Sequence, residues 1–156
     1  MNDGLGKEAE QKIREWLDRP EDGYSFDRIP DQLSGFYGSK NICDFICFKS
    51  PYMYYIESKA TWEDRFSFNM LTETQHKGLM DKTKISNVFG LVIVLFASYK
   101  RAFVFHIENI DMLEKQGIKS LKKIDKWPIP YKEIKTIPNS RKKHLDYTGE
   151  LEEYII

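Results

Sequence analysis

Two carboxylates and one ammonium interrupt the two apolar strands of a hairpin expected from the sequence, and a further lysine, Lys49, lies at its turn. Asp44, Glu57 and Lys59 lie within CDFICFKSPYMYYIESK, which reads as two apolar strands joined by a tight turn. If the turn is centred between Ser50 and Pro51, Asp44 lies opposite Glu57, and opposed residues have Cβ atoms roughly 5 Å apart on one face of the sheet. Glu57 and Lys59 are two residues apart and share that face, so one cluster holds all three charges.

This cluster has the composition of a metal site for phosphodiester hydrolysis. Two carboxylates this close need a compensating cation, or one of them must stay protonated. Hard oxygen ligands suit Mg²⁺, which commonly takes one or two carboxylates and completes its shell with water and phosphate oxygens. Such an ion can polarise a phosphodiester, while Lys59 orients water or neutralises developing charge. The alternative is an exposed hairpin on which Glu57 and Lys59 form a weak surface ion pair.

The elements around this hairpin predict a small α/β domain. Apolar residues at helical spacing predict a helix over about residues 4–18, and a second helix is expected near 72–86. The nearly continuous apolar run 88–97 is typical of a strand buried on both faces of a sheet. We therefore expect a single domain over residues 1–156, with a central mixed β-sheet flanked by helices. The remaining expected elements are strands at 24–29 and 102–107 and helices at 109–116 and 149–156.

The composition excludes several classes of protein. Of the 156 residues, 41% are hydrophobic and 14% aromatic, which is too rich in core-forming side chains for a disordered protein. The longest apolar run is too short to span a bilayer and the first residues are polar, so we expect a cytoplasmic protein with no membrane partner. Cys43 and Cys47 lie four residues apart on one expected strand, too far apart for a disulfide, and are interpreted as small core residues.

The motifs and their order resemble those of the PD-(D/E)xK nucleases. Within that superfamily the chain resembles Holliday-junction resolvases of the RecU type, including the compact versions carried by phages. The signature is Asp44 followed by Glu57-Ser58-Lys59, with Cys43 in the place usually taken by proline. The chain departs from the family between Pro30 and Asp44, where RecU proteins carry a longer insertion that projects into the junction. This difference bears on junction selectivity more than on catalysis.

Two helical segments extend the resemblance. Gly6-Lys7-Glu8-Ala9-Glu10 is similar to the Gly-x-x-x-Glu of the first helix in these resolvases, whose glutamate reaches the metal site. Counting from Gly6 selects Glu10, and Glu8 is the fallback. Thr74-Gln75-His76 resembles the start of the family's second helix, which carries Gln75 over as an active-site residue. For both segments, a solvated helix face is the alternative interpretation.

The resemblance implies a restriction-endonuclease-like fold and a specific chemistry. Family members are homodimeric, Mg²⁺-dependent endonucleases of DNA recombination and repair that make paired nicks in four-way or branched DNA, and we expect Mn²⁺ to substitute. Asp44, Glu57 and Glu10 would hold the metal, Lys59 would position the nucleophile, and Gln75 would support them. Two alternatives stay open: a restriction- or repair-type endonuclease of the same fold that cuts ordinary duplex DNA, and a catalytically inert DNA-binding module.

Contacts with DNA phosphates are expected from basic and polar side chains. The net charge is zero, but lysines are concentrated in the second half of the chain, which can place a phosphate-binding surface beside an acidic site. A lysine-rich solvated face explains these charges equally well, and Arg28 could instead pair with Asp27 or Asp31. The three histidines have no convergent spacing and are assigned no chemistry. The DNA-binding candidates are Arg28, Ser39, Lys40, Lys122, Lys123, Arg141, Lys142 and Lys143.

Overall fold

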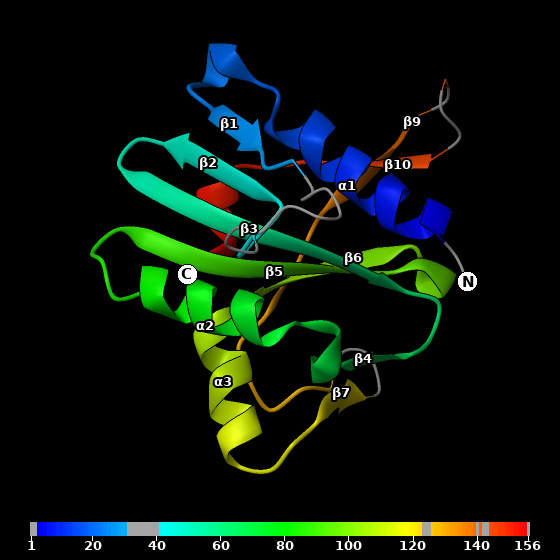
Figure 1. Cartoon of the computed structure of the whole chain (residues 1–156). Helices are drawn as coiled ribbons and strands as arrows, with labels where there is room; N and C mark the ends of the chain where they lie inside the picture. Colours follow the sequence, from blue (N-terminus) through cyan, green and yellow to red (C-terminus); the bar gives the residue numbers. More distant parts are fainter. Residues whose placement is uncertain (1–2, 31–40, 123–125, 140, 142–143, 156) are drawn as a thin grey trace.

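A mixed six-stranded β-sheet forms the middle layer of the molecule (Figure 1). The computed structural model describes residues 3–30, 41–122, 126–139, 141 and 144–155. Strand β3 pairs in parallel with β5, and every other pair in this sheet is antiparallel. The predicted α/β fold with a central mixed sheet is confirmed. In sheet order the strands are β1 (Ser25–Arg28), β2 (Phe45–Lys49), β3 (Tyr52–Thr61), β5 (Val88–Phe96), β6 (Arg101–His106) and β8 (Lys132–Glu133).

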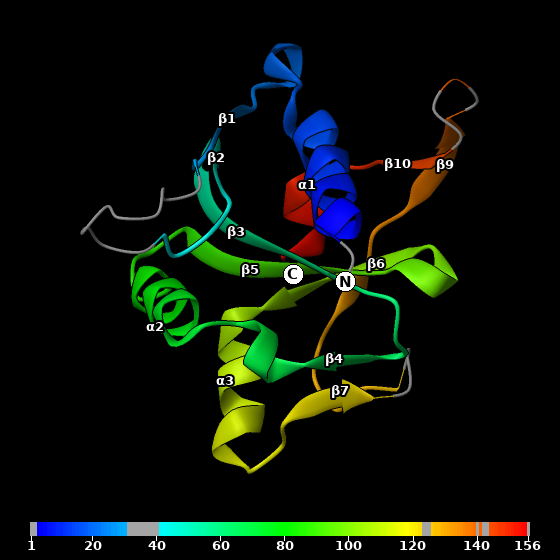
Figure 2. The same ribbon diagram turned by 45° about the vertical axis from the view of Figure 1, so that its right-hand side comes forward.

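Helices cover both faces of the sheet (Figures 1 and 2). Helix α1 (Asp3–Leu17) packs on one face, and α2 (Glu73–Lys82) and α3 (Ile107–Lys115) pack on the other. The apolar positions of α1 recur at helical spacing and are buried against the sheet, as the sequence predicts. In the described ranges, none of the helices combines the length and apolar character needed to cross a membrane. The buried residues of α1 are Leu5, Ala9, Ile13, Trp16 and Leu17.

Two glycines bring α2 close to the strands that carry the charged cluster. A Cβ atom at Gly90 on β5 would lie 2.9 Å from the carbonyl oxygen of Leu79, so only glycine allows the helix backbone to approach this strand so closely. A Cβ atom at Gly78 would overlap the side chain of Ile42, two residues before Asp44. Gly78, which weakens the helix by propensity, is therefore required for packing at the start of the hairpin.

Several elements differ from the sequence prediction. Helix α2 ends at Lys82, four residues earlier than predicted, and the expected closing helix is a short 3₁₀ turn over Leu151–Tyr154. Both cysteines are buried and free, as predicted, but Cys43 precedes β2 and does not share a strand with Cys47. The strands that the sequence analysis missed are β8 and two short pairs: β4 (Arg65–Ser67) with β7 (Ser120–Lys122), and β9 (Thr136–Asn139) with β10 (His144–Tyr147).

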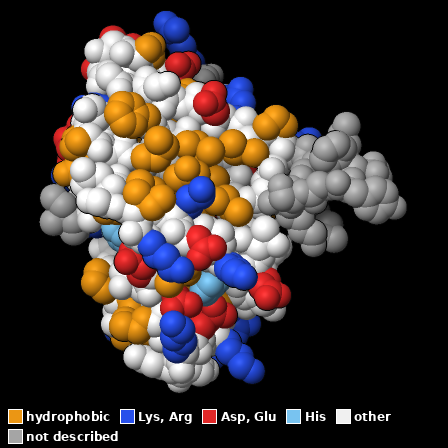
Figure 3. Space-filling view, turned by 60° about the vertical axis from the view of Figure 1, so that its left-hand side comes forward, with side chains coloured by type: hydrophobic (Ala, Val, Ile, Leu, Met, Phe, Trp, Pro, Cys, Tyr) orange, Lys and Arg blue, Asp and Glu red, His pale blue; other side chains and the backbone are white. Residues whose placement is uncertain are grey.

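Hydrophobic side chains gather along one edge of the sheet. The β2–β3 turn and the connection between α2 and β5 lie at the left in Figure 1, and Figure 3 shows orange side chains concentrated on this edge above a region of mixed charge. Phe48 on β2 is 44% exposed, and Ile85 in the connection is 57% exposed. Asp44 lies at the opposite end of β2 from the turn, so this apolar edge is separate from the charged cluster.

Candidate active site

The β2–β3 hairpin brings Asp44 beside Glu57. Residues 45–49 pair with residues 52–56 in the register expected from the turn, so the predicted register is confirmed within the two strands. Asp44 precedes β2, and its backbone N–H donates to the carbonyl oxygen of Ile56 at 3.0 Å, which is one residue out of that register. The backbone N–H of Ser58 donates to Asp44 Oδ2 at 2.9 Å, which fixes the Asp44 carboxylate at the point where the two strands begin to separate.

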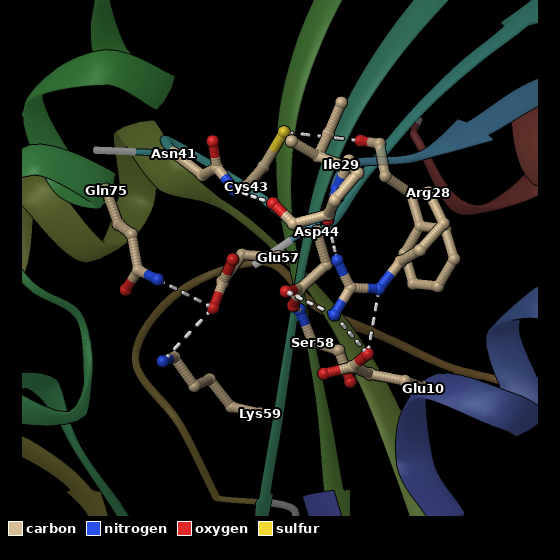
Figure 4. Close-up of polar contacts among 12 residues, drawn as sticks. Glu10, Arg28, Ile29, Asn41, Cys43, Asp44, Glu57, Ser58, Lys59 and Gln75 are labelled. Carbon is tan, nitrogen blue, oxygen red and sulfur yellow. Dashed lines mark hydrogen bonds and ion pairs between the residues drawn. The ribbon is translucent and has the colours of Figure 1, made fainter. Parts of the chain in front are cut away.

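Glu57 is a buried carboxyl group with its two oxygens in different environments (Figure 4). Only 2% of the residue is exposed. Oε2 accepts from Gln75 Nε2 at 3.0 Å and lies 3.1 Å from Lys59 Nζ, which confirms that Lys59 shares the face of Glu57. Oε1 is buried and has no hydrogen-bond partner among the described residues. Burial, together with the charge of Asp44, raises the pKa of Glu57 to about 8, although Lys59 acts in the opposite direction.

Gln75 connects the start of α2 to Glu57. The backbone N–H of Gln75 donates to the hydroxyl of Thr72 at 3.1 Å, and its side-chain oxygen accepts from the backbone N–H of Thr72 at 3.0 Å. This reciprocal arrangement is a capping box, which satisfies two N–H groups at the helix start. Because the amide oxygen is held at the cap, its nitrogen is directed toward Glu57, and Figure 4 shows the resulting contact.

Arg28 holds Glu10 on the other side of Asp44. Its Nε and Nη2 donate to Glu10 Oε1 at 2.9 and 2.6 Å, and Nη2 lies 3.8 Å from Asp44 Oδ1. A further Arg28 N–H donates to the carbonyl oxygen of Ile29. Figure 4 shows Asp44 between two groups: Glu10 and Arg28 on the α1 side, and the Glu57 contacts on the α2 side. Glu8 instead lines a hollow shared with Tyr147 and Lys12, so Glu10 is the glutamate of α1 beside Asp44.

The described residues suit a divalent ion that takes two carboxylates from the protein. The unpartnered Oε1 of buried Glu57 is a polar atom that needs a partner, and the neighbouring Asp44 carboxylate supplies a second hard oxygen donor. Glu10 is neutralised by Arg28 in this arrangement. In the described part of the chain, no group of three or more His, Cys, Asp or Glu side chains converges on one metal position. The three-carboxylate ligand set therefore stays a prediction.

An open cleft leads to this cluster. It has a volume of about 660 Å³ and includes Lys7, Glu10, Ser58 and Lys59 in its lining. The cleft is continuous with the solvent, so an extended strand can reach Lys59 from outside. This access distinguishes the cluster from a closed structural ion pair in a core.

The DNA-binding candidates that the structure describes do not form one surface. Lys122 is exposed at the end of β7, and Arg141 is exposed in the β9–β10 connection, and Figures 1 and 2 show these two elements at opposite ends of the molecule. Arg28 is mostly buried beside Glu10 and Asp44. The candidates Ser39, Lys40, Lys123, Lys142 and Lys143 lie outside the described residues.

Two polar contacts were missed by the sequence analysis. The pairing of Arg28 with Glu10 joins the end of β1 to α1, and no sequence spacing links these residues. His76 lies between two carboxylates of α3, with Nε2 2.9 Å from Asp111 Oδ1 and Nδ1 3.0 Å from Glu114 Oε1. The helical spacing of Asp111 and Glu114 on α3 is a signal for such a pair, but their partner on α2 is set by the tertiary fold.

Most of the chain matches a known protein family. The family model for recombination protein U (RecU) matches residues 27–153. Among solved structures, the chain is similar to Hjc of Archaeoglobus fulgidus, described as a Holliday junction resolvase from an archaeal hyperthermophile. That match has a TM-score of 0.47 and 15% sequence identity, and it covers 66% of this chain and 78% of the other. No curated protein matches the chain.

Proposed function

The chain belongs to the RecU family of recombination proteins and is a Holliday-junction resolvase, and we propose that it makes paired, Mg²⁺-dependent nicks in four-way DNA as a homodimer. The observation that supports this proposal is the Glu57 carboxyl group. It is buried beside Asp44, one oxygen contacts Lys59 and Gln75, and the other has no partner among the described residues. A bound divalent cation would balance the negative charge of this buried carboxylate, so the ionised form of Glu57 would be stable without a proton.

Each residue of the cluster has a distinct proposed role. Asp44 and Glu57 would hold a divalent ion, and Glu10 would be a third ligand once its contact with Arg28 is released. When bound, such an ion would supply Lewis-acid chemistry, polarising the phosphodiester and making water more acidic. Lys59 lines the cleft and has its ammonium group 3.1 Å from Glu57 Oε2, where it would orient the attacking water and neutralise negative charge that develops on the phosphate.

Gln75 and Arg28 are proposed as positioning residues. Gln75 is held by the helix cap and donates to Glu57 Oε2, so it keeps the rotamer of Glu57 fixed. Arg28 balances the charges of Glu10 and Asp44 before the metal binds. After the metal binds, the guanidinium can contact a phosphate oxygen, so Arg28 keeps its predicted role in DNA binding.

The homodimer follows from the geometry of the reaction. One cluster can cut one strand, whereas a four-way junction is resolved by cuts in two opposed strands. A pair of chains related by a two-fold axis presents two identical sites with the symmetry of the junction. Sedimentation at several protein concentrations tests this assembly directly, and a monomer that retains paired nicking would contradict it.

The experiment compares cutting of a labelled four-way junction with cutting of a linear duplex of the same sequence. Each substrate is incubated with Mg²⁺, with Mn²⁺ and with chelator, using the wild type, Lys59→Ala and Lys115→Ala. Lys115 is the matched control because it is an exposed lysine paired with Asp111, far along α3 from the cluster. We expect metal-dependent paired nicks near the crossover that Lys59→Ala abolishes and Lys115→Ala retains. Equal cutting of the linear duplex would reject junction selectivity and keep the active site.

A further inference from the structure

A second hollow lies beside the catalytic cleft, on the far side of the N-terminal half of α1. It has a volume of about 580 Å³, within the range of about 300–1,000 Å³ typical of small-molecule sites. Helix α1, the β9–β10 pair and the 3₁₀ turn Ala97–Tyr99 surround it, and these elements lie at the same end of the sheet in Figures 1 and 2. Trp62 lines both this hollow and the catalytic cleft. The hollow therefore adjoins the path of any strand bound at Lys59.

Trp62 has a fixed backbone and an uncovered side chain. Its carbonyl oxygen accepts from the hydroxyl of Ser98 at 2.6 Å, and the adjacent turn is held by the backbone N–H of Glu63, which donates to Thr61 Oγ1 at 3.1 Å. The residue is nevertheless 54% exposed. An exposed indole ring on a backbone held in place is suited to stacking on another aromatic ring, and nucleobases of any identity offer such a ring.

The lining contains buried polar groups suited to a ligand with hydrogen-bond acceptors. Lys12 is 8% exposed, and its ammonium group donates to the carbonyl oxygen of Leu145 at 2.8 Å and lies 5.9 Å from the centre of the Tyr147 ring. An ammonium group has three donors, so this bond leaves further donor capacity. Tyr147 is 7% exposed, and its hydroxyl has no hydrogen-bond partner among the described residues. A buried hydroxyl without a partner costs free energy that a bound acceptor can recover.

The other lining groups match the remaining parts of a nucleotide. Leu95 and Pro138 provide apolar walls, Glu8 provides an acceptor for a base amino group, and exposed Lys100 provides a cation at the rim. Lys59 and Trp62 are three residues apart along β3 and its extension, which corresponds to about 10 Å. A duplex strand rises about 3.4 Å per nucleotide, so the hollow lies about three nucleotides from the phosphate at Lys59.

We propose that this hollow binds one unpaired nucleotide of the DNA strand that passes through the catalytic cleft. The base stacks on Trp62 and accepts hydrogen bonds from Tyr147 and Lys12, while Lys100 contacts the adjacent phosphate. Strand exchange at a junction crossover supplies nucleotides that are transiently unpaired, and a base that is already unpaired is cheaper to extrude than a paired one. This inference rests on the proposed function because it takes its ligand from the DNA bound for cutting.

The test uses junctions that carry 2-aminopurine as a single unpaired nucleotide at successive positions on either side of the cut. Binding is followed by 2-aminopurine fluorescence with Ca²⁺ in place of Mg²⁺, under conditions in which no strand is cut. Trp62→Ala is compared with Trp62→Phe, which keeps an aromatic face, and with Tyr147→Phe, which removes only the hydroxyl. Tyr99→Ala is the matched control, because Tyr99 is an aromatic residue 45% exposed on the neighbouring turn and outside the lining.

We expect a fluorescence change near the third nucleotide from the cut that Trp62→Ala abolishes, with binding weaker by about 5- to 100-fold. Trp62→Phe should recover most of the affinity, and Tyr147→Phe should weaken binding by about 3- to 10-fold. In Mg²⁺, Trp62→Ala should raise KM and leave kcat close to the wild-type value. The fully paired linear duplex should show a smaller loss, because it offers no free base.

Separate outcomes overturn the inference and the proposed function. If the wild type nicks the junction and Trp62→Ala binds and cuts equally well, the nucleotide site is rejected and the nuclease stands. If the wild type binds but does not nick, while Trp62→Ala still loses the fluorescence change, the proposed function fails and the site stands. A free deoxynucleotide that binds as tightly as the strand would reject a DNA site in favour of a small-molecule one. An equal loss in Tyr99→Ala would also reject it, and no DNA binding at all would reject both.

Discussion

Glu57 and Glu10 lie on opposite sides of Asp44 and differ in how their charges are balanced. Glu10 is partly exposed, and its Oε1 accepts two N–H groups of the Arg28 guanidinium. Glu57 is almost fully buried, has a pKa raised to about 8, and leaves Oε1 without a described partner. The first carboxylate is stable as the molecule stands, whereas the second is stable only with a proton or an added cation. This difference indicates that Glu57, on the α2 side of the site, is the carboxylate that gains most from a bound metal ion.

The same chemical change on the two glutamates tests this difference and should have the largest effect. Glu57→Gln keeps the size of the side chain and removes its charge, so we expect junction nicking to fall by on the order of 10²–10³-fold. Glu10→Gln should lower it by about tenfold, because Glu10 contributes only after Arg28 releases it. Single-turnover nicking rates at saturating Mg²⁺ measure both. Equal losses of nicking in the two variants would show that Glu57 and Glu10 contribute equally to metal-dependent cutting.

The raised pKa of Glu57 predicts a pH dependence of stability in the absence of divalent ions. The folded state keeps the Glu57 proton up to about pH 8, whereas the unfolded chain releases it near the ordinary value of 4.5. Between these values the folded state binds more protons, so the free energy of unfolding falls as pH rises, by at most about 1.4 kcal/mol per pH unit. Stability from this group is complete below about pH 4.5 and is lost above about pH 8.

Urea unfolding of the wild type and Glu57→Gln at pH 5, 6.5 and 8 measures this effect. The amide cannot ionise, so the difference in unfolding free energy between the two proteins should grow with pH in favour of the variant. Mg²⁺ added at pH 8 should stabilise the wild type and leave Glu57→Gln nearly unchanged, because the ion replaces the lost proton. Parallel pH profiles for the two proteins would mean that Glu57 ionises near its ordinary pKa.

The α2 side of the site could be predicted from the sequence because its geometry is local. A two-residue turn fixes the hairpin register, and that register brings Asp44, just before β2, close to Glu57, while Lys59 shares the face of Glu57. The α1 side depends on how a helix crosses a strand, so the pairing of Glu10 with Arg28 leaves no spacing signal. Sequence reasoning therefore selected Glu10 by resemblance and assigned Arg28 to DNA, with Asp27 or Asp31 as the alternative ion-pair partners.

The C-terminal part of the chain was the least predictable for a related reason. Strands β4 and β7 are three residues long and pair across more than fifty positions, so neither has a periodicity of its own. Pro138 lies within β9, where proline argues against a strand unless it lies in an edge or a small ribbon. The central strand β5 was predictable because burial on both faces made it continuously apolar.

The contacts of Gln75 give the smallest expected effects on the α2 side of the site. Its role in the helix cap and its hydrogen bond to Glu57 can be tested separately by substitution. Thr72→Ala removes the cap hydroxyl and leaves the Gln75 side chain, so it should cost about 1 kcal/mol of unfolding free energy and change nicking by less than about threefold. Gln75→Ala removes the other half of the capping box together with the donor to Glu57 Oε2, and should also lower nicking about tenfold. Urea unfolding and nicking rates for the single and double variants separate the two effects. If Thr72→Ala alone lowers nicking as much as Gln75→Ala, the position of α2 controls the site. If only Gln75→Ala does so, the amide contact itself controls the orientation of Glu57.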